Sequence, residues 1–275
     1  MADQNLPEVR SGLNVGLSVS RSEDLARFGL TETHVRMALG EIARAVLVAD
    51  GRLTYGGHLR EDGYTLFLVQ EIERFGLRNR PFTGYIPYSV HRQMSMYEIS
   101  ERIEDISVLG RYLFLDADGE TIDPAVGRSL EPAPVDESME KHALSAARAV
   151  MSDVIDGRVA LGGQREGFRG RMPGVIEETI LAVRASKPVY IAGGFGGATG
   201  DMAVALGNDR DNWLGLDVTG NPYVDELRDA VAEHGWEPTA NGLTEEENQR
   251  LAITYRASEI AFLIVTGLSR LTRTI

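Results

Sequence analysis

The glycines of this chain gather in three short segments, and this clustering constrains the fold more than any other feature. Residues 56–63, 157–174 and 193–200 hold fourteen of the 30 glycines. In each segment a glycine pair ends a short apolar run, and a stretch with helical spacing follows. Glycine at this density is typical of places where the backbone needs a positive φ or must approach another group closely. The three segments therefore predict strand-to-helix loops with a special role.

Apolar runs and helical patterns alternate along the rest of the chain. The runs that predict strands are 13–20, 52–57, 82–87, 112–117, 158–163, 187–194 and 213–218. The helical patterns are 33–49, a stretch starting at Thr65, 96–107, 137–154, 173–186, 223–234 and a long final helix from Thr244. Uniformly apolar strands that alternate with helices are typical of a parallel sheet covered on both faces. We therefore expect an α/β fold, a Rossmann-like doubly wound parallel sheet with helices on both faces.

The length suits one domain. With 275 residues, we expect a single Rossmann-like nucleotide-binding domain over 1–275 with a C-terminal helical extension at about 221–275. Apolar residues of the last helix, between Leu251 and Val265, belong either to the domain core or to an interface between copies, and we favour the core. We also expect a homo-oligomer.

Charge and composition exclude several kinds of site. A net charge of −13 argues against a broad nucleic-acid or anionic-membrane surface, since either needs a basic face. The absence of cysteine excludes thiolate metal sites, and the five histidines lack metal-binding spacing, so we expect no metal and no cofactor. No apolar run is long enough for a membrane span and the first residues lack signal-peptide features, which predicts a cytoplasmic protein with no membrane partner.

The glycine segments are suited to hold an anion. A glycine pair after a strand turns backbone N–H groups toward a ligand, and the next helix presents its positive N-terminal end there. Arg60, Arg165, Arg169 and Arg171 would add donors for phosphate oxygens. None of the segments spells the Walker pattern GxxxxGK[ST]. The alternatives are plain turn chemistry for the glycines and solvated surface positions for the arginines, in a chain with 26 Arg and two Lys.

The order of the motifs carries a resemblance. A strand ends in Ser18-x-Ser20, YGGxLRxxGYT follows at 55–65, and AGGFGGATGDMA lies at 192–203. This series resembles the SLOG superfamily, the Rossmann-like group named for the DNA-processing protein Smf/DprA and the cytokinin-activating "lonely guy" enzymes. The TRPM-channel-like and prokaryotic antiphage branches are the most similar. The resemblance covers most of residues 13–206.

The resemblance implies a nucleotide-type ligand, with adenosine or ADP-ribose derivatives as the leading class, and a role as a sensor or effector module. It implies that Thr65 caps the helix behind the second loop. Phe195 would stack on a base or fill the core beneath its loop. The residues expected to contact the ligand are Ser18, Ser20, Gly56, Gly57, Arg60, Gly63, Thr65, Gly163, Arg165, Arg169, Arg171, Gly193, Gly194, Phe195, Gly196 and Gly197.

A departure from the family pattern bears on catalysis. When the PGGxGTxxE motif of the "lonely guy" enzymes is placed on residues 192–200, Gly200 stands at the glutamate. A hydrolase of N-glycosidic bonds needs a carboxylate to stabilise an oxocarbenium-like state or to activate water. Asp201 is adjacent, and Glu177 or Glu178 could reach in from the preceding helix. We expect binding without turnover; the alternative is a nucleotide N-glycosidase or phosphoribohydrolase.

Overall fold

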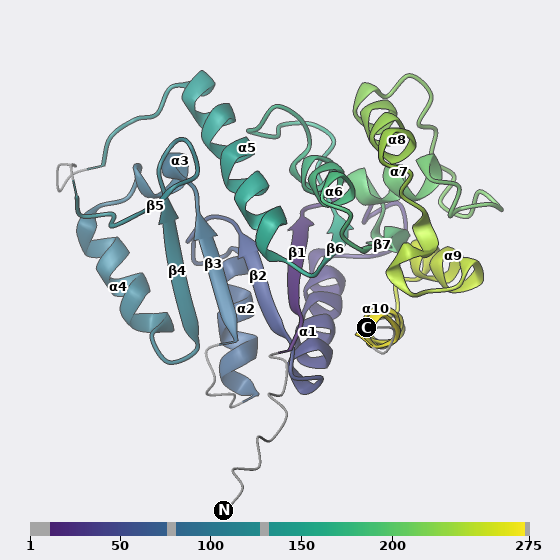
Figure 1. The fold of residues 1–275 in the computed structure, drawn as a ribbon, viewed down its shortest axis with the longest axis horizontal. Helices are drawn as coiled ribbons and strands as arrows, with labels where there is room; N and C mark the ends of the chain where they lie inside the picture. Colours follow the sequence, from purple (N-terminus) through teal and green to yellow (C-terminus); the bar gives the residue numbers. More distant parts are fainter. Residues whose placement is uncertain (1–11, 76–80, 127–131, 273–275) are drawn as a thin grey trace, which may run out of the picture.

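A seven-stranded sheet forms the centre of the molecule (Figure 1). The computed structural model describes residues 12–75, 81–126 and 132–272. The strands lie in the order β5-β4-β3-β2-β1-β6-β7, and only β5 is antiparallel, to β4. Their bounds are β1 Asn14–Ser20, β2 Arg52–Gly56, β3 Phe82–Ile86, β4 Gly110–Leu115, β5 Thr121–Ile122, β6 Gly157–Gly162 and β7 Val189–Ala192.

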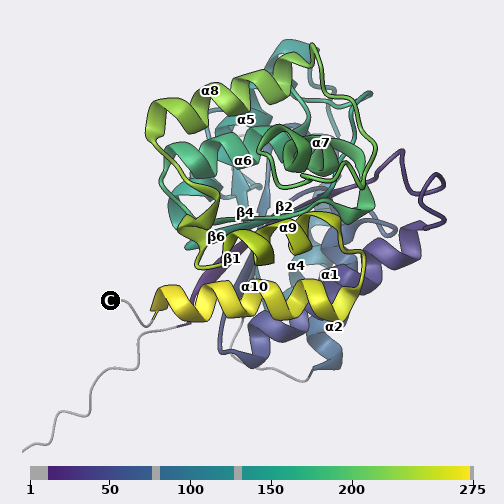
Figure 2. The same cartoon turned by 90° about the vertical axis from the view of Figure 1, so that its right-hand side faces the viewer.

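Helices cover both faces of the sheet (Figure 2). One face carries α1 Glu32–Val48, α2 Tyr64–Arg74, α4 Met96–Ile106 and α10 Ala257–Thr272. The other face carries α5 Glu137–Val154, α6 Gly174–Arg184, α7 Gly197–Ala205 and, outside α6, α8 Pro222–His234. Short elements complete the set: α3 Tyr88–His91, α9 Glu245–Ile253 and the 3₁₀ turns Gly193–Phe195 and Pro238–Asn241. The predicted doubly wound α/β fold is confirmed.

Apolar side chains of the strands alternate between two cores. Leu17 of β1 packs with Ile42 of α1 and Ile264 of α10 in one core, and Ile191 of β7 packs with Ile176 of α6 in the other. Ile260, Leu263 and Ile264 of α10 therefore complete the first core, as we favoured from the sequence, whereas Phe262 is exposed. Among the described residues, no helix has both the length and the apolar character that a bilayer crossing requires.

Two predicted elements are wrong. Residues 213–218 form no strand, because the Asp209 carboxylate accepts the backbone N–H groups of Trp213 and Leu214 at 2.8 and 2.9 Å. Strand pairing would need those donors. The long final helix is in fact two, since Thr254 is extended and ends α9. The carbonyl oxygen of Thr254 lies where a Cβ on Gly194 would be. The break between α9 and α10 therefore lets Thr254 pack against the glycine loop that contains Gly194.

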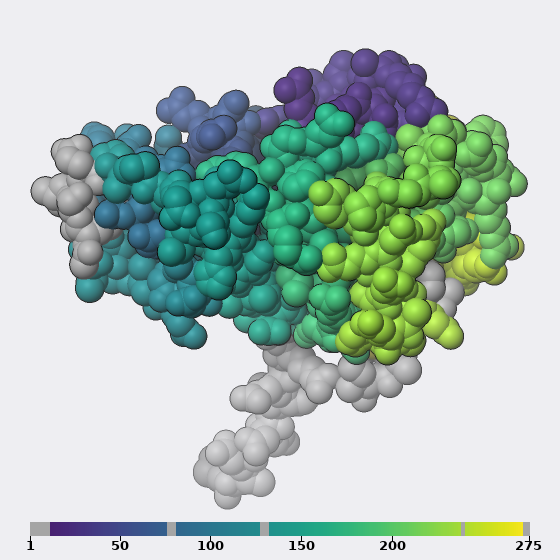
Figure 3. All heavy atoms as spheres, turned by 90° about the horizontal axis from the view of Figure 1, so that it is seen from above, coloured from purple at the N-terminus to yellow at the C-terminus, as the bar shows by residue number. Residues whose placement is uncertain are grey.

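The order in which the strands are added to the sheet reverses at β1, although β1 and β6 run parallel. The strands β2 to β5 extend from one side of β1, whereas β6 and β7 lie on the other, so the carboxyl ends of β1 and β6 flank the topological switch point. Gly163 N–H donates to Ser20 O at 3.0 Å and Gln164 N–H donates to Ser20 Oγ at 3.2 Å. Figure 3 looks down on this edge, where N-terminal and central segments adjoin. Open α/β sheets bind their ligands here.

Candidate functional site

A cavity of about 390 Å³ opens at the carboxyl edge of the sheet. Val19 and Ser20 line it from β1, Tyr55 and the loop 56–60 from β2, and the segment 164–178 from the chain after β6. One face of α5 closes it with four residues, Leu144, Ala147, Arg148 and Met151. Its size lies within the roughly 300–1,000 Å³ of pockets that bind small ligands.

The cavity brings together six of the residues predicted from the sequence. These are Ser20, Gly56, Gly57, Arg60, Arg169 and Glu178. Ser18 is buried and its hydroxyl donates a hydrogen bond to Glu178. Gly63 is the N-cap of α2, at the end of the loop that follows β2. Gly163, Arg165, Arg171 and Glu177 flank the cavity without lining it. For all of these, contact with a ligand stays a prediction.

The loop after β2 is closely packed. A Cβ on Gly57 would lie 2.5 Å from Cε1 of Tyr55, and one on Gly56 would overlap the thioether of Met151. A side chain at either position would therefore have to displace Tyr55 or Met151, which both line the cavity. Thr65 is buried inside α2 and its hydroxyl donates to the His58 carbonyl at 2.8 Å, which holds the loop against the helix. The capping prediction for Thr65 is wrong, because the N-cap of α2 is Gly63.

His58 contributes a neutral ring to this loop. Burial lowers the pKa of His58 below its usual value, and the positive charge of Arg60 lowers that pKa further. Desolvation and a nearby cation both disfavour the imidazolium form. At neutral pH the ring therefore carries no positive charge; its Nδ1 accepts from the backbone N–H of Arg60 at 3.3 Å, which leaves the Nε2–H as a donor.

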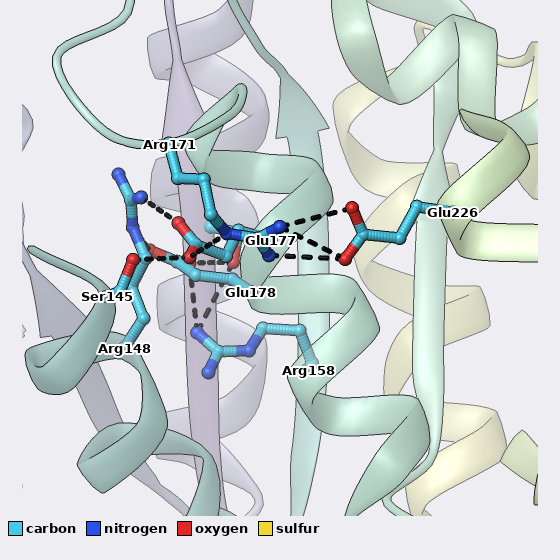
Figure 4. A network of polar contacts seen from close by, with 8 residues as sticks. Ser145, Arg148, Arg158, Arg171, Glu177, Glu178 and Glu226 are labelled. Carbon is cyan, nitrogen blue, oxygen red and sulfur yellow. Dashed lines mark hydrogen bonds and ion pairs between the residues drawn. The ribbon is translucent and has the colours of Figure 1, made fainter. Parts of the chain in front are cut away.

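Glu178 reaches the cavity from α6, where a buried network holds it (Figure 4). Its Oε2 accepts a hydrogen bond from Ser18 Oγ and another from Arg158 Nη1 at 3.1 Å. Arg158 lies in β6 and is fully buried. Oε1 accepts no hydrogen bond within the described part of the chain and lies 3.8 Å from Arg148 Nε. One oxygen is thus fixed and the other is left for a ligand or a water.

Arg148 is a cavity residue that the sequence analysis missed. It extends from α5 over two glycines, since a Cβ on Gly170 or Gly174 would lie 2.5 or 2.6 Å from its terminal nitrogens. Its Nη1 donates to Glu177, whose other oxygen accepts from Ser145 Oγ at 2.6 Å. Glu177 is therefore a positioning residue for Arg148. The spacing of Gly170 and Gly174 indicates that a large side chain packs against both, but the sequence alone does not identify that side chain.

Arg171 lies on the outer side of this network. Its guanidinium pairs with Glu226 of α8 at 3.2 Å and its Nε lies 3.7 Å from Glu177 (Figure 4). Half of its side chain is exposed. The structure therefore links Arg171 to α8 and to Glu177, and Arg171 does not line the cavity.

A comparison of the sequence with models of known protein families agrees with this arrangement of glycine loops at the switch point of a doubly wound sheet. A family model described as SLOG cluster2 matches residues 9–251. The chain belongs to the SLOG superfamily. The match runs from before β1 into α9, beyond the region over which the motifs carry the resemblance. No curated protein matches the chain significantly. Membership supports a nucleotide-related Rossmannoid domain.

The third glycine loop of this SLOG domain lies outside the cavity. Side chains on Gly193 and Gly194 would overlap the carbonyls of Ala252 and Thr254, while Gly196 and Gly197 have φ of +67° and +62°. Phe195 is fully buried in the core, the second of the two alternatives for this ring. Gly193 and Gly194 thus allow the end of α9 to pack closely on the loop, and Gly196 and Gly197 allow the tight turn at which α7 begins. Their predicted contact with phosphate stays a prediction.

A carboxylate of the chain itself occupies the N-terminus of α7 in the SLOG domain. Asp24 Oδ2 accepts from Gly197 N–H at 2.8 Å and from Arg165 Nη2 at 2.7 Å. Arg165 also makes two bonds of 2.8 Å to Asp201. The two carboxylates raise the pKa of Arg165, and Arg165 together with Gly197 N–H lowers the pKa of Asp24 against the opposing effect of burial. The anion-binding end of this helix is thereby satisfied internally.

No three histidine, aspartate or glutamate side chains in the described ranges gather closely enough to hold a metal ion.

Proposed function

We propose that this SLOG protein binds an adenine-nucleotide-derived small molecule, of the ADP-ribose or cyclic ADP-ribose type, and acts as a nucleotide sensor or effector module in antiphage signalling. The observation that carries the proposal is the cavity at the switch point, which a glycine loop and arginines line. Superfamily membership supports a nucleotide as its occupant.

The chemistry of the lining fits the parts of a nucleotide. Apolar side chains such as Leu144, Met151 and Val175 suit a base. Arg60 is exposed at the rim, and within the described residues its guanidinium forms no ion pair. Arg148 and Arg169 pair with Glu177 and Glu140, so Arg60 is the cation with most charge left to offer a phosphate.

The test is titration calorimetry of the full chain with AMP, ADP-ribose and cyclic ADP-ribose, with chromatography of the ligand afterwards. We expect binding with the ligand recovered intact. Arg60→Ala should weaken binding at least about tenfold, the value of a charge-assisted hydrogen bond. Arg52→Ala, an exposed arginine at the opposite edge of the sheet, is the matched control. If no adenine nucleotide binds, the proposal is wrong.

A second candidate function follows from Glu178. Its free Oε1 faces a cavity suited to a nucleotide, and a carboxylate in that place can activate water for attack on the anomeric carbon as the bond to the base breaks. The protein would then be a nucleotide N-glycosidase or phosphoribohydrolase. Release of free base by the wild type, and its loss in Glu178→Gln when activity is normalised to the folded fraction, would favour this candidate over the sensor. The normalisation is needed because this substitution leaves Arg158 buried without its partner.

We also propose that the protein acts in the cytoplasm as a homo-oligomer. A hollow of about 410 Å³ between α1 and α10 is lined by Val48 and Phe262, which are 77% and 67% exposed. Exposed apolar side chains gathered in this way are typical of interaction surfaces. Light scattering should give the mass of an oligomer that falls in Phe262→Ser and not in Tyr97→Ser, a matched exposed aromatic on α4. A monomeric wild type contradicts this proposal.

A further inference from the structure

A second cavity, of about 510 Å³, adjoins the first. Four residues line both cavities: His58, Arg60, Val90 and Arg169. The second cavity lies over the loop after β2 and beside α3 and α4. The two exposed arginines therefore stand between two hollows, and a ligand of sufficient length can occupy both at once.

The two cavities differ in their chemistry. The first is lined by many apolar side chains, whereas the second has Glu61, Ser89, Gln93 and Glu98 among its lining residues. Carboxylates, an amide and a hydroxyl are suited to the hydroxyl groups of a sugar, which need acceptors as well as donors. The arginines between the cavities are suited to phosphate.

Ser89 gives an independent indication that the second cavity binds something polar. The residue is fully buried, and its hydroxyl has no hydrogen-bond partner within the described residues. A buried polar group without a partner costs free energy, and such groups are rare unless a ligand or water satisfies them. Ser89 lines this cavity and not the first.

We infer that the second cavity is a subsite for the sugar end of a linear, two-ended nucleotide, with the base in the first cavity and the diphosphate at Arg60 and Arg169. This inference rests on the proposed function and narrows it to a nucleoside diphosphate sugar. A mononucleotide fills only the first cavity, and a ring-closed nucleotide has no free sugar end to extend into the second.

The experiment compares AMP, linear ADP-ribose and cyclic ADP-ribose by calorimetry on the wild-type chain and on Ser89→Ala. The wild type should bind linear ADP-ribose at least about tenfold more tightly than either of the other two. Ser89→Ala should weaken only linear ADP-ribose, by about three- to tenfold, the value of one hydrogen bond. Ser100→Ala on α4 is the matched control, because its hydroxyl donates to the Met96 carbonyl of its own helix and Ser100 lines neither cavity.

Gln93→Ala is a second variant in case Ser89→Ala unfolds. Gln93 is exposed, and its amide donates to the Ser89 carbonyl at 2.6 Å, so its loss should act on the same ligand alone. The inference is overturned if AMP binds as tightly as linear ADP-ribose, if the cyclic form binds best, or if neither variant separates the ligands. Failure of every nucleotide to bind would instead remove the proposed function, and the inference with it.

Discussion

Arg158 Nη1 donates to Glu178 Oε2 at 3.1 Å, and this pair joins the buried sheet to the cavity. Arg158 has no exposed surface, and burial lowers its pKa while the charge of Glu178 opposes that effect. Ser18 and Ser152 complete the polar surroundings of the pair. A charge held so deep in a parallel sheet needs its partner, because an unpaired buried ion is costly.

Removal of one partner should therefore destabilise the fold strongly. We expect Arg158→Met to lower the free energy of unfolding by about 3–5 kcal/mol, the usual cost of a broken buried pair. The double variant Arg158→Met/Glu178→Gln should recover part of this loss, since no buried charge stays unpaired. Urea denaturation measures both. Arg52→Met in β2, an exposed arginine, is the control and should change stability little; an equal loss there would contradict the explanation.

The space over Gly174 should be required for the position of Arg148. A Cβ at Gly174 would lie 2.6 Å from Arg148 Nη2, the far end of a flexible side chain, so Gly174→Ala should displace the guanidinium and leave the fold intact. We expect nucleotide affinity to fall about tenfold with little change in melting temperature, because one charge-assisted hydrogen bond is lost.

The control for this prediction is Gly207→Ala. Gly207 has a φ of +72° and lies outside the cavity, so alanine there should show the opposite pattern, with lower stability and unchanged affinity. If Gly174→Ala binds nucleotide as the wild type does, Arg148 does not contact the ligand.

His58 should make the protein less stable in mild acid. Its pKa is lowered in the folded state, first by burial and then by Arg60, so below the unfolded value of about 6.5 the unfolded chain binds more protons. This contribution to stability is fully present above pH 6.5 and is lost as the pH falls toward the folded pKa. We expect His58→Gln to lose less stability than the wild type between pH 7.5 and 5.5. Urea titrations at the two pH values, with His142→Gln as control, measure the difference.

The order of the elements could be predicted from the sequence, because apolar strands and helical spacing are local patterns. The carboxyl-edge position of Gly56, Gly57 and Ser20 followed from that order. The partners of Glu178 and Arg148 did not, since Ser18, Arg158 and Gly174 come from separate elements that only the folded sheet brings together. The break at Thr254 was equally hidden, because it depends on packing against Gly194.

The glycine pairs after β2 and β7 should respond differently to the same substitution. A Cβ at Gly57 would lie 2.5 Å from the Tyr55 ring beside the cavity, whereas one at Gly194 would overlap backbone atoms of Thr254 that cannot move aside. We expect Gly57→Ala to weaken nucleotide binding more than folding. Gly194→Ala should lower the free energy of unfolding by about 1–3 kcal/mol, the cost of overpacking, while the folded fraction keeps its affinity. Calorimetry combined with denaturation separates the two effects. A specific loss of affinity in Gly194→Ala would instead show that the third glycine loop contacts the ligand.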